Sequence, residues 1–248
     1  MADWQEGRVA RQRAWNATHY SLEIDCDLEP FTAGQFVRVG LDIEGERVIR
    51  PYSCVNAPHQ RGVEILYNVV PEGPLTNRLA QLREGDRVWV GPSATGFLTL
   101  SQVPQNVRDL WLLATGTGIG PFLSILQTEE PWQRFERIVL AYGVRETVNL
   151  TYPHLLEELQ QQHPDTLRIV PCITSRDPGV GYFGRITEAL RDGQLEVLAE
   201  QEINREHSHV MLCGHQGMIK EVTEQLGDRG LKRHLRHDPG QISSEKYH

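Results

Sequence analysis

The sequence predicts a two-domain protein: an antiparallel β-barrel followed by an α/β domain with a doubly wound parallel sheet. The first 100 residues carry short alternating apolar and polar runs, broken by turn residues such as Ala33-Gly34 and Glu44-Gly45. Several short strands at this spacing are typical of an antiparallel barrel or sandwich. From about Val107, continuous apolar runs alternate with helical patterns, which indicates a parallel sheet covered by helices.

The domains are placed at residues 1–101 and 107–248, and the polar stretch around Pro104 divides them. In the first domain the alternation predicts strands at residues 8–15, 20–25, 35–39, 47–56, 63–70, 87–90 and 97–100, with one short helix at 75–82. In the second domain the patterns predict strands at 110–115, 138–144, 167–174 and 209–213, and helices at 122–127, 153–162, 187–198 and 217–226.

Composition and charge exclude several classes of protein. Of 248 residues, 39 % are hydrophobic and 23 % are charged, which is typical of a soluble globular chain. The 25 Lys and Arg against 33 Asp and Glu leave a net charge of −8, which argues against general binding of nucleic acid or membrane. The N-terminus lacks a signal-peptide pattern, and no apolar run reaches the roughly 20 residues of a spanning helix.

The four cysteines are scattered without a CxxC pair, so we expect no disulfide framework and a cytoplasmic protein. The ten histidines form no ligand pattern, and we expect surface histidines and no metal site.

The first motif is Arg50-Pro51-Tyr52-Ser53, on a predicted barrel strand. Because side chains alternate along a strand, Arg50 and Tyr52 point to the same face. A guanidinium there suits a phosphate, and the tyrosine ring suits stacking on a flat heteroaromatic group. An ordinary strand with an exposed arginine and a packed tyrosine is the alternative.

Two further motifs stand at predicted helix starts. Gly73-Pro74-Leu75-Thr76 opens the short helix of the barrel domain, where free N–H groups favour an anion, although a capped helix covering the barrel is the alternative. Gly116-Thr117-Gly118-Ile119-Gly120 joins an apolar strand to a helix. It is neither GxGxxG nor a Walker loop, but its glycines allow close approach of a ligand to the backbone. A tight packing turn is the other interpretation.

Polar residues follow the later predicted strands. Arg145, Ser175-Arg176 and Cys213-Gly214 each come directly after an apolar strand, at the edge where open α/β sheets bind ligands. Together they indicate a phosphate-bearing dinucleotide, and Ser175-Arg176 suits a 2′-phosphate, although Asp177 follows at once. Taken singly, each arginine could be a solvated surface charge.

In this order the motifs resemble the ferredoxin–NADP reductase family, especially the bacterial ferredoxin/flavodoxin–NADP reductases, from Trp4 to Tyr247. The resemblance implies an FAD-binding antiparallel barrel and an NADP-binding α/β domain. It also implies hydride transfer between the nicotinamide C4 and FAD N5, followed by single-electron exchange with a ferredoxin or flavodoxin.

The resemblance assigns roles residue by residue. For FAD it implies Arg50 at the pyrophosphate, Tyr52 stacked on the isoalloxazine, and Ser53 near N5, with Pro51 beside them. Further FAD contacts would come from Asn68, Val69, Val70, Gly73, Leu75, Thr76 and Thr117, and from Tyr247 or His248 near the adenine. For NADP(H) it implies Gly116, Gly118, Arg145, Ser175, Arg176 and Arg185. The expected catalytic residues are Tyr52, Ser53 and Cys213, with Cys213 near the nicotinamide.

We expect a monomer that docks an acidic carrier protein through a basic patch gathered at one cleft. The candidates for this patch are Arg50, Arg83, Arg87, Lys232, Arg233 and Arg236. Two other functions stay open: an NAD(P)H-dependent flavin reductase or oxygenase reductase component on the same fold, and a non-enzymatic flavin-binding subunit.

Overall fold

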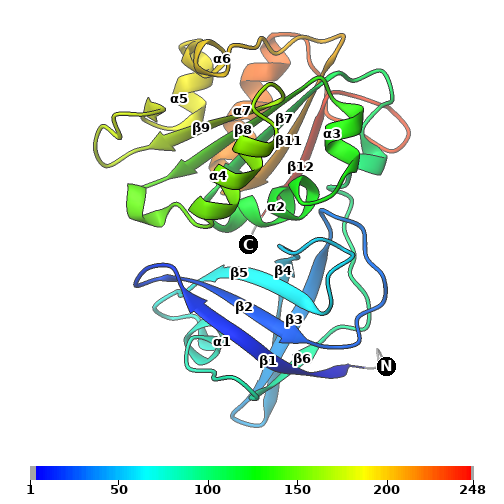
Figure 1. The fold of residues 1–248 in the computed structure, drawn as a ribbon, viewed down its shortest axis with the longest axis vertical. Coiled ribbons are helices and arrows are strands. Elements are labelled where there is room, and N and C mark those ends of the chain that lie inside the picture. Colours follow the sequence, from blue (N-terminus) through cyan, green and yellow to red (C-terminus); the bar gives the residue numbers. More distant parts are fainter. Residues whose placement is uncertain (1–3, 247–248) are drawn as a thin grey trace. The chain divides into compact units, whose positions relative to one another are not determined.

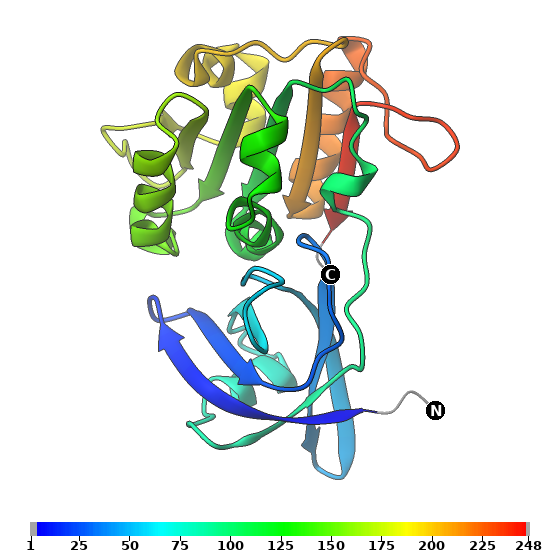
Figure 2. The same cartoon turned by 45° about the vertical axis from the view of Figure 1, so that its right-hand side comes forward.

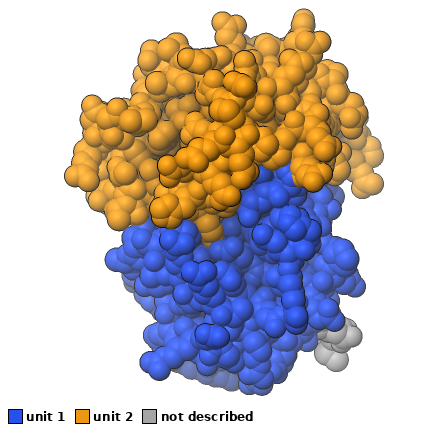
Figure 3. Space-filling view, in the orientation of Figure 1, with its two compact units in different colours: residues 1–99, 120–128 blue, residues 100–119, 129–248 orange. Residues whose placement is uncertain are grey.

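The computed structural model describes residues 4–246, and the chain divides into two compact units (Figure 3). Unit 1 combines the chain up to Thr99 with Gly120–Thr128, and unit 2 combines Leu100–Ile119 with the chain from Glu129 onward. No helix among the described residues is long and apolar enough to cross a membrane.

Unit 1 is a six-stranded antiparallel sheet in the order β4-β3-β6-β1-β2-β5 (Figure 1). Its two outermost strands meet where Cys54 bridges to Ile65 and the Val55 N–H donates to the Glu64 carbonyl at 2.8 Å. This closes the sheet, and the predicted antiparallel barrel is confirmed. The strands are β1 (Gln5–Ala14), β2 (His19–Asp25), β3 (Phe36–Ile43), β4 (Glu46–Ser53), β5 (Val63–Asn68) and β6 (Arg87–Val90).

The barrel core is made of the inward-facing residues of these strands. Val37, Val39 and Ile65 are completely buried, as the alternation of apolar and polar residues requires. The helix α1 (Pro74–Leu79) adds Leu75 and Leu79 to the same core. The strand predicted at residues 97–100 is wrong, because the chain makes only one bridge, from Thr95 to Phe36, before the 3-10 turn η1 (Leu100–Gln102).

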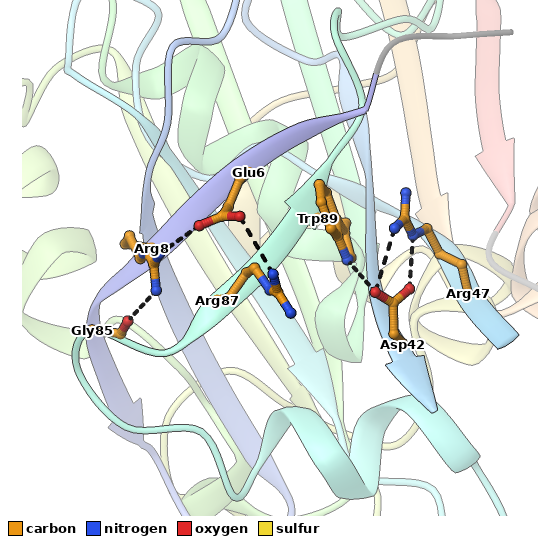
Figure 4. A network of polar contacts seen from close by, with 7 residues as sticks. All are labelled: Glu6, Arg8, Asp42, Arg47, Gly85, Arg87 and Trp89. Atoms are coloured by element: carbon orange, nitrogen blue, oxygen red, sulfur yellow. Dashed lines mark hydrogen bonds and ion pairs between the residues drawn. The ribbon is translucent and has the colours of Figure 1, made fainter. Parts of the chain in front are cut away.

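A polar network ties four strands together on the outside of the barrel (Figure 4). Asp42 of β3 accepts hydrogen bonds from the Arg47 Nε at 2.9 Å and from the Trp89 indole N–H at 2.8 Å. The Arg47 guanidinium also lies 3.9 Å from the centre of the Trp89 ring. These hydrogen bonds hold the pKa of Asp42 below its usual value, so its stabilising contribution is lost only as the pH falls through that lowered pKa.

Unit 2 is a six-stranded parallel sheet in the order β10-β9-β8-β7-β11-β12. The chain steps outward from β7 to β10 and then returns to place β11 on the other side of β7. This reversal is the topological switch point of a doubly wound sheet, as predicted. The strands are β7 (Asp109–Thr115), β8 (Arg137–Val144), β9 (Leu167–Ile173), β10 (Tyr182–Phe183), β11 (Ser208–Gly214) and β12 (Ile242–Lys246).

Helices cover both faces of the unit 2 sheet (Figures 1 and 2). One face is covered by α5 (Ile186–Arg191), α6 (Gln194–Ala199) and α7 (Gln216–Asp228), whose buried residues form one core with β7, β8, β9 and β11. On the other face lies α4 (Pro153–Gln162). The continuous helix predicted at 187–198 is wrong, because Gly193 adopts a φ of 71° and separates α5 from α6.

Three details of unit 2 differ from what the sequence predicts. The edge strands β10 and β12 were not predicted, since each is short and carries polar or aromatic residues instead of an apolar run. The short helix α3 (Glu130–Arg134) was also missed, and its Arg134 donates to the carbonyls of Leu100, Val103 and Pro104. His209, expected at the surface, is buried on the central strand β11, where burial lowers its pKa to about 3.

Candidate functional site

The Arg-Pro-Tyr-Ser segment lies at the end of β4, an outermost strand of the unit 1 sheet. Arg50 is exposed; its Nη1 donates to the Ile49 carbonyl at 2.7 Å, and none of residues 4–246 supplies it with an acidic partner. Pro51 lacks an N–H group, which an edge strand tolerates. Ser53 is buried at the strand end. The segment therefore offers an unneutralised guanidinium two residues from an aromatic ring.

Three tyrosines pack beside one another behind this segment. The Tyr52 ring meets Tyr67 edge-on, with centroids 6.3 Å apart, and Tyr67 stacks on Tyr20 at 5.8 Å. Burial raises the pKa of Tyr52 to about 12, so the phenol stays neutral at physiological pH. The Tyr67 hydroxyl is buried and has no hydrogen-bond partner among the described residues. An orphaned buried hydroxyl is costly, and an atom of a bound ligand would satisfy it.

The loop before α1 is held by side chains of the helix itself. The Thr76 hydroxyl accepts from the Val70 N–H at 3.1 Å, and the Asn77 amide donates to the Val70 carbonyl at 2.9 Å and the Gly73 carbonyl at 2.8 Å. Leu75 is buried in the barrel core, so only its backbone can face a ligand. Asn68 and Val70 are exposed and Val69 is half-buried. Asn77, which sequence reasoning missed, therefore holds the loop in shape.

The helix after the glycine loop, α2 (Gly120–Leu126), belongs to unit 1. The buried Ser124 hydroxyl donates to the Asn56 carbonyl at 2.7 Å, and the Gln127 amide donates to the Val55 carbonyl at 2.8 Å. The sequence places residues 107–248 in one domain, whereas these hydrogen bonds attach this helix to the barrel. The pattern of apolar residues along a helix does not reveal which sheet the helix packs against.

In unit 2 the glycine loop after β7 touches the end of β11. A Cβ atom on Gly118 would lie 2.4 Å from the Cys213 carbonyl oxygen, and one on Gly214 would lie 2.2 Å from the Thr115 Oγ1. Thr115 Oγ1 also accepts the His215 N–H at 2.8 Å. The two strand ends thus approach each other closely, glycine backbone against the Cys213 carbonyl on one side and against Thr115 on the other, as close approach at a switch point requires.

Gly116 and Thr117 form the exposed side of this loop. Gly116 has a φ of 54° and open space where a Cβ would lie. Glycine is therefore favoured there by the backbone conformation and not by a lack of space. Thr117 is half-buried in the 3-10 turn η2 (Gly116–Ile119).

Arginines without acidic partners follow β8, β9 and β10. Arg145, Arg176 and Arg185 are exposed, and within residues 4–246 their guanidinium groups form no ion pair, although the Glu188 carboxylate accepts the backbone N–H of Arg185 at 2.7 Å. The Ser175 N–H donates to the Arg145 carbonyl at 2.9 Å, which joins the ends of β8 and β9. The Asp177 carboxylate accepts the Gly179 N–H at 2.8 Å and, among the described residues, forms no ion pair with Arg176.

Cys213 is buried at the end of β11, and its neighbour in register on β12 is Glu245. Residues in register on adjacent strands share one face of the sheet. Burial raises the pKa of Glu245 to about 7, and its Oε2 has no hydrogen-bond partner in the described part of the chain. Sequence reasoning missed Glu245, since one acid in a polar C-terminal segment gives no signal until the strand is known.

The basic residues that flank the strands of unit 2 lie at both ends of its sheet. Lys232, Arg233 and Arg236 precede β12, so they lie at the amino end of the parallel sheet, whereas Arg145 and Arg176 lie at the carboxyl end. The direction of each strand decides at which edge of the sheet its flanking loops lie, and the predicted docking patch stays a prediction. In unit 1, Arg87 is ion-paired with Glu6 at 3.6 Å.

Tyr247 and His248, expected near an adenine ring, lie outside the described residues. Among residues 4–246, no group of three or more His, Cys, Asp or Glu side chains could hold a metal ion.

Comparison with known proteins identifies the family. Residues 10–96 match an oxidoreductase FAD-binding domain and residues 112–224 match an oxidoreductase NAD-binding domain. A flavodoxin/ferredoxin–NADP reductase of Escherichia coli is 43 % identical over 223 residues, which cover 90 % of this chain and 89 % of that protein. The chain belongs to the flavodoxin/ferredoxin–NADP reductase family.

Two further relatives agree with this assignment. A ferredoxin–NADP reductase of Pseudomonas aeruginosa is 33 % identical over 241 residues, covering 94 % of this chain and 92 % of that one. A crystal structure of a ferredoxin NADP+ reductase from Neisseria gonorrhoeae with bound FAD and NADP superposes with a TM-score of 0.93 at 30 % identity, and covers 99 % of both chains. The chain is therefore an oxidoreductase with FAD-binding and NAD-binding domains, and the predicted resemblance is confirmed.

The residues of unit 1 fit a flavin dinucleotide. Arg50 carries a positive charge without an acidic partner, the half-buried Tyr52 has a neutral ring, and the Tyr67 hydroxyl lacks a partner in the described chain. A phosphate would complement Arg50, a flat ring would complement Tyr52, and a polar ring atom would complement the Tyr67 hydroxyl.

Replacing Gly118 by alanine tests the backbone contact in unit 2. The added methyl group would meet the Cys213 carbonyl at 2.4 Å, so Gly118→Ala should lower the free energy of unfolding by about 1–3 kcal/mol, measured by urea denaturation. Gly227→Ala in α7 is the control, because its Cβ would meet nothing within 4 Å, and it should be neutral or slightly stabilising. Equal stability of the two variants would contradict the contact.

Replacing Glu245 by glutamine tests its altered protonation. The folded state holds the Glu245 proton more tightly than the unfolded state, because the pKa of this carboxyl is raised to about 7. The free energy of unfolding of the wild type should therefore fall as the pH rises from about 4.5 through 7. Over that pH range the free energy of unfolding of Glu245→Gln should rise by about 2–3 kcal/mol relative to that of the wild type. The exposed Glu224→Gln serves as control, and parallel stability–pH curves for wild type and Glu245→Gln would refute the expectation.

Proposed function

We propose that this protein transfers electrons between NADP(H) and a ferredoxin or flavodoxin, with FAD held by unit 1 and NADP(H) by unit 2. The observation that carries the proposal is the set of exposed arginines without acidic partners at the carboxyl edge of the parallel sheet. NADP(H) differs from NAD(H) by a 2′-phosphate, which guanidinium groups bind by paired hydrogen bonds. The names of the relatives at 43 % and 33 % identity support the same substrates.

In unit 1, Arg50 binds the pyrophosphate of FAD, and the backbone at Gly73, Leu75 and Thr76 completes the anion site. Tyr52 stacks on the isoalloxazine, and its neutral phenol adds no charge beside the flavin. Ser53 donates a hydrogen bond near N5, with Pro51 beside it. Asn68, Val69 and Val70 line the ring by backbone. When bound, FAD would supply a group that can accept two electrons together and release them singly, which suits a one-electron carrier.

In unit 2, Gly116 and Gly118 leave room for the nicotinamide and the pyrophosphate of NADP(H), because glycines carry no side chains. Cys213 flanks the nicotinamide and orients it, without acting as an acid or base. Arg145, Ser175, Arg176 and Arg185 bind the phosphates.

The domain limits of residues 1–101 and 107–248 are part of the same proposal as limits along the chain, although the helix Gly120–Leu126 packs with unit 1, and the glycine loop is proposed to serve the dinucleotide. We further propose a cytoplasmic monomer that binds neither nucleic acid nor membrane. The net charge of −8 and the four free cysteines support this.

Side-by-side acceptor assays test the function. Purified protein loaded with FAD should use NADPH to reduce ferredoxin and flavodoxin faster than free flavin, measured by absorbance at equal acceptor concentrations. A protein that takes up no FAD would overturn the proposal. Reduction of free flavin that outpaces both carriers would instead assign a flavin reductase.

The dinucleotide preference is tested at Arg176. Losing a hydrogen-bonded charge at the 2′-phosphate should raise the KM for NADPH about ten- to one-hundred-fold and leave the KM for NADH unchanged in Arg176→Ala. Arg205→Ala is the matched control, since Arg205 is also exposed but precedes β11 at the opposite end of the sheet. An unchanged NADPH-to-NADH ratio in Arg176→Ala would remove Arg176 from the site.

A further inference from the structure

The chain passes between the two units at three places. Unit 1 ends at Thr99, resumes at Gly120 and ends again at Thr128, so the crossings lie at 99/100, 119/120 and 128/129. The first crossing opens residues 100–107, here called the connection, which include the polar stretch around Pro104 that the sequence predicts as the domain boundary. The groups that hold these crossings determine how freely one unit can move against the other.

The connection is buried and hydrogen-bonded. Leu100 and Val103 are each 3 % exposed, and Val107 is 7 % exposed. The Val103 N–H donates to the Leu100 carbonyl at 3.0 Å, and the Val107 N–H donates to the Pro104 carbonyl at 3.3 Å. A flexible linker would leave these groups to water. The connection is therefore an ordered part of the fold.

One side chain holds the start of the connection. The Arg134 guanidinium donates to the Leu100 carbonyl at 2.7 Å, to the Val103 carbonyl, and to the Pro104 carbonyl at 3.2 Å. Only 13 % of the side chain is exposed, so water competes little for these hydrogen bonds. The planar fork of a guanidinium can serve several carbonyl groups at once, whereas the ammonium group of a lysine is a single point of charge.

The helix that carries Arg134 starts beside the third crossing. α3 begins at Glu130, two residues after Thr128, and the Arg134 Nη1 also donates to the Glu130 Oε1 at 3.3 Å. The helix is anchored to the end of α4, because Trp132 stacks on His163 with ring centres 3.7 Å apart and planes 4° apart. Arg134 thus ties the first crossing to the third through a helix that is itself fixed within unit 2.

We propose that Arg134 clamps the hinge formed by these crossings, and thereby positions the two dinucleotides for hydride transfer. The inference rests on the proposed function, in which different units hold FAD and NADP(H), and C4 of the nicotinamide loses the hydride that N5 of the flavin gains. Such a transfer needs the reacting atoms about 3–3.5 Å apart, and a displacement of 1 Å can slow it about a hundredfold.

Arg134 acts on this reaction only through the backbone. Among the described residues, the hydrogen bonds of its guanidinium go to the connection and to Glu130, and to none of the residues proposed to bind a dinucleotide. It is therefore a positioning residue, and its loss should alter the rate of hydride transfer without altering the affinity of either site.

Hydrogen–deuterium exchange of the FAD-loaded protein tests the clamp. In Arg134→Gln the amides of Val103 and Val107 should exchange about ten- to one-hundred-fold faster, because hydrogen bonds from a charged group no longer hold the connection. Arg108→Gln is the matched control, since Arg108 directly follows the connection but its side chain forms an exposed ion pair with Glu136 at 3.8 Å. Exchange in this variant should match that of the wild type.

Single-turnover reduction of the bound flavin by NADPH tests the positioning role. The limiting rate should fall about ten- to one-hundred-fold in Arg134→Gln, while the NADPH concentration that gives half of this rate and the affinity for adenosine 2′-monophosphate keep their wild-type values. Arg134→Lys should show smaller changes in the same direction, because it keeps the charge and loses the fork. It also replaces Arg134→Gln in both experiments if that variant does not fold.

Three results would overturn the inference. Wild-type exchange of the connection in Arg134→Gln would show that this side chain holds no hinge. Faster exchange with an unchanged limiting rate would deny it a role in positioning. Weaker binding of NADPH at an unchanged limiting rate would assign it to substrate binding instead. Failure of the wild type to take up FAD or oxidise NADPH would count against the proposed function, while exchange would still test the clamp.

Discussion

The contact between the glycine loop after β7 and the end of β11 is the constraint on which unit 2 depends. Gly118 lies against the Cys213 carbonyl, and Gly214 lies against the hydroxyl and backbone of Thr115. These strands are neighbours at the place where the order of the sheet reverses, so their connections leave toward opposite faces. Glycines there let the strand ends converge while the carboxyl edge stays open to a ligand.

The carboxyl edge of the unit 2 sheet shows how a chain with a negative net charge can offer a site for phosphate. The net charge is −8, and many arginines are paired with acids, as Arg229 is with Glu196 at 2.8 Å. Arg145, Arg176 and Arg185 have no such partner within the described chain. Asp177, the nearest acid in sequence, is engaged by the Gly179 N–H. A total charge therefore says little about the local field, which depends on which charges are already neutralised.

Unit 1 depends on a different constraint, the closure of its sheet. The bridge between Cys54 and Ile65 joins the outermost strands directly after Ser53, so the end of β4 is held where the barrel closes. Tyr52 and Tyr67 are brought together there from β4 and β5, which follow one another in the chain but stand at opposite ends of the sheet order. The orphaned Tyr67 hydroxyl is a by-product of this packing, and it marks the place where a ligand atom would relieve an unpaired polar group.

The sequence alone determined the two fold classes, the order of the main strands and the motifs that carry the chemistry. This was possible because alternation, continuous apolar runs and glycine loops are local patterns. Only the tertiary structure decided which helix attaches to which sheet, as Ser124 and Gln127 show, and which arginines share an edge. It alone placed Glu245 beside Cys213 and set Arg134 against the carbonyls of the connection between the units. Such placements depend on strand pairing and direction between distant segments, and no local pattern encodes them.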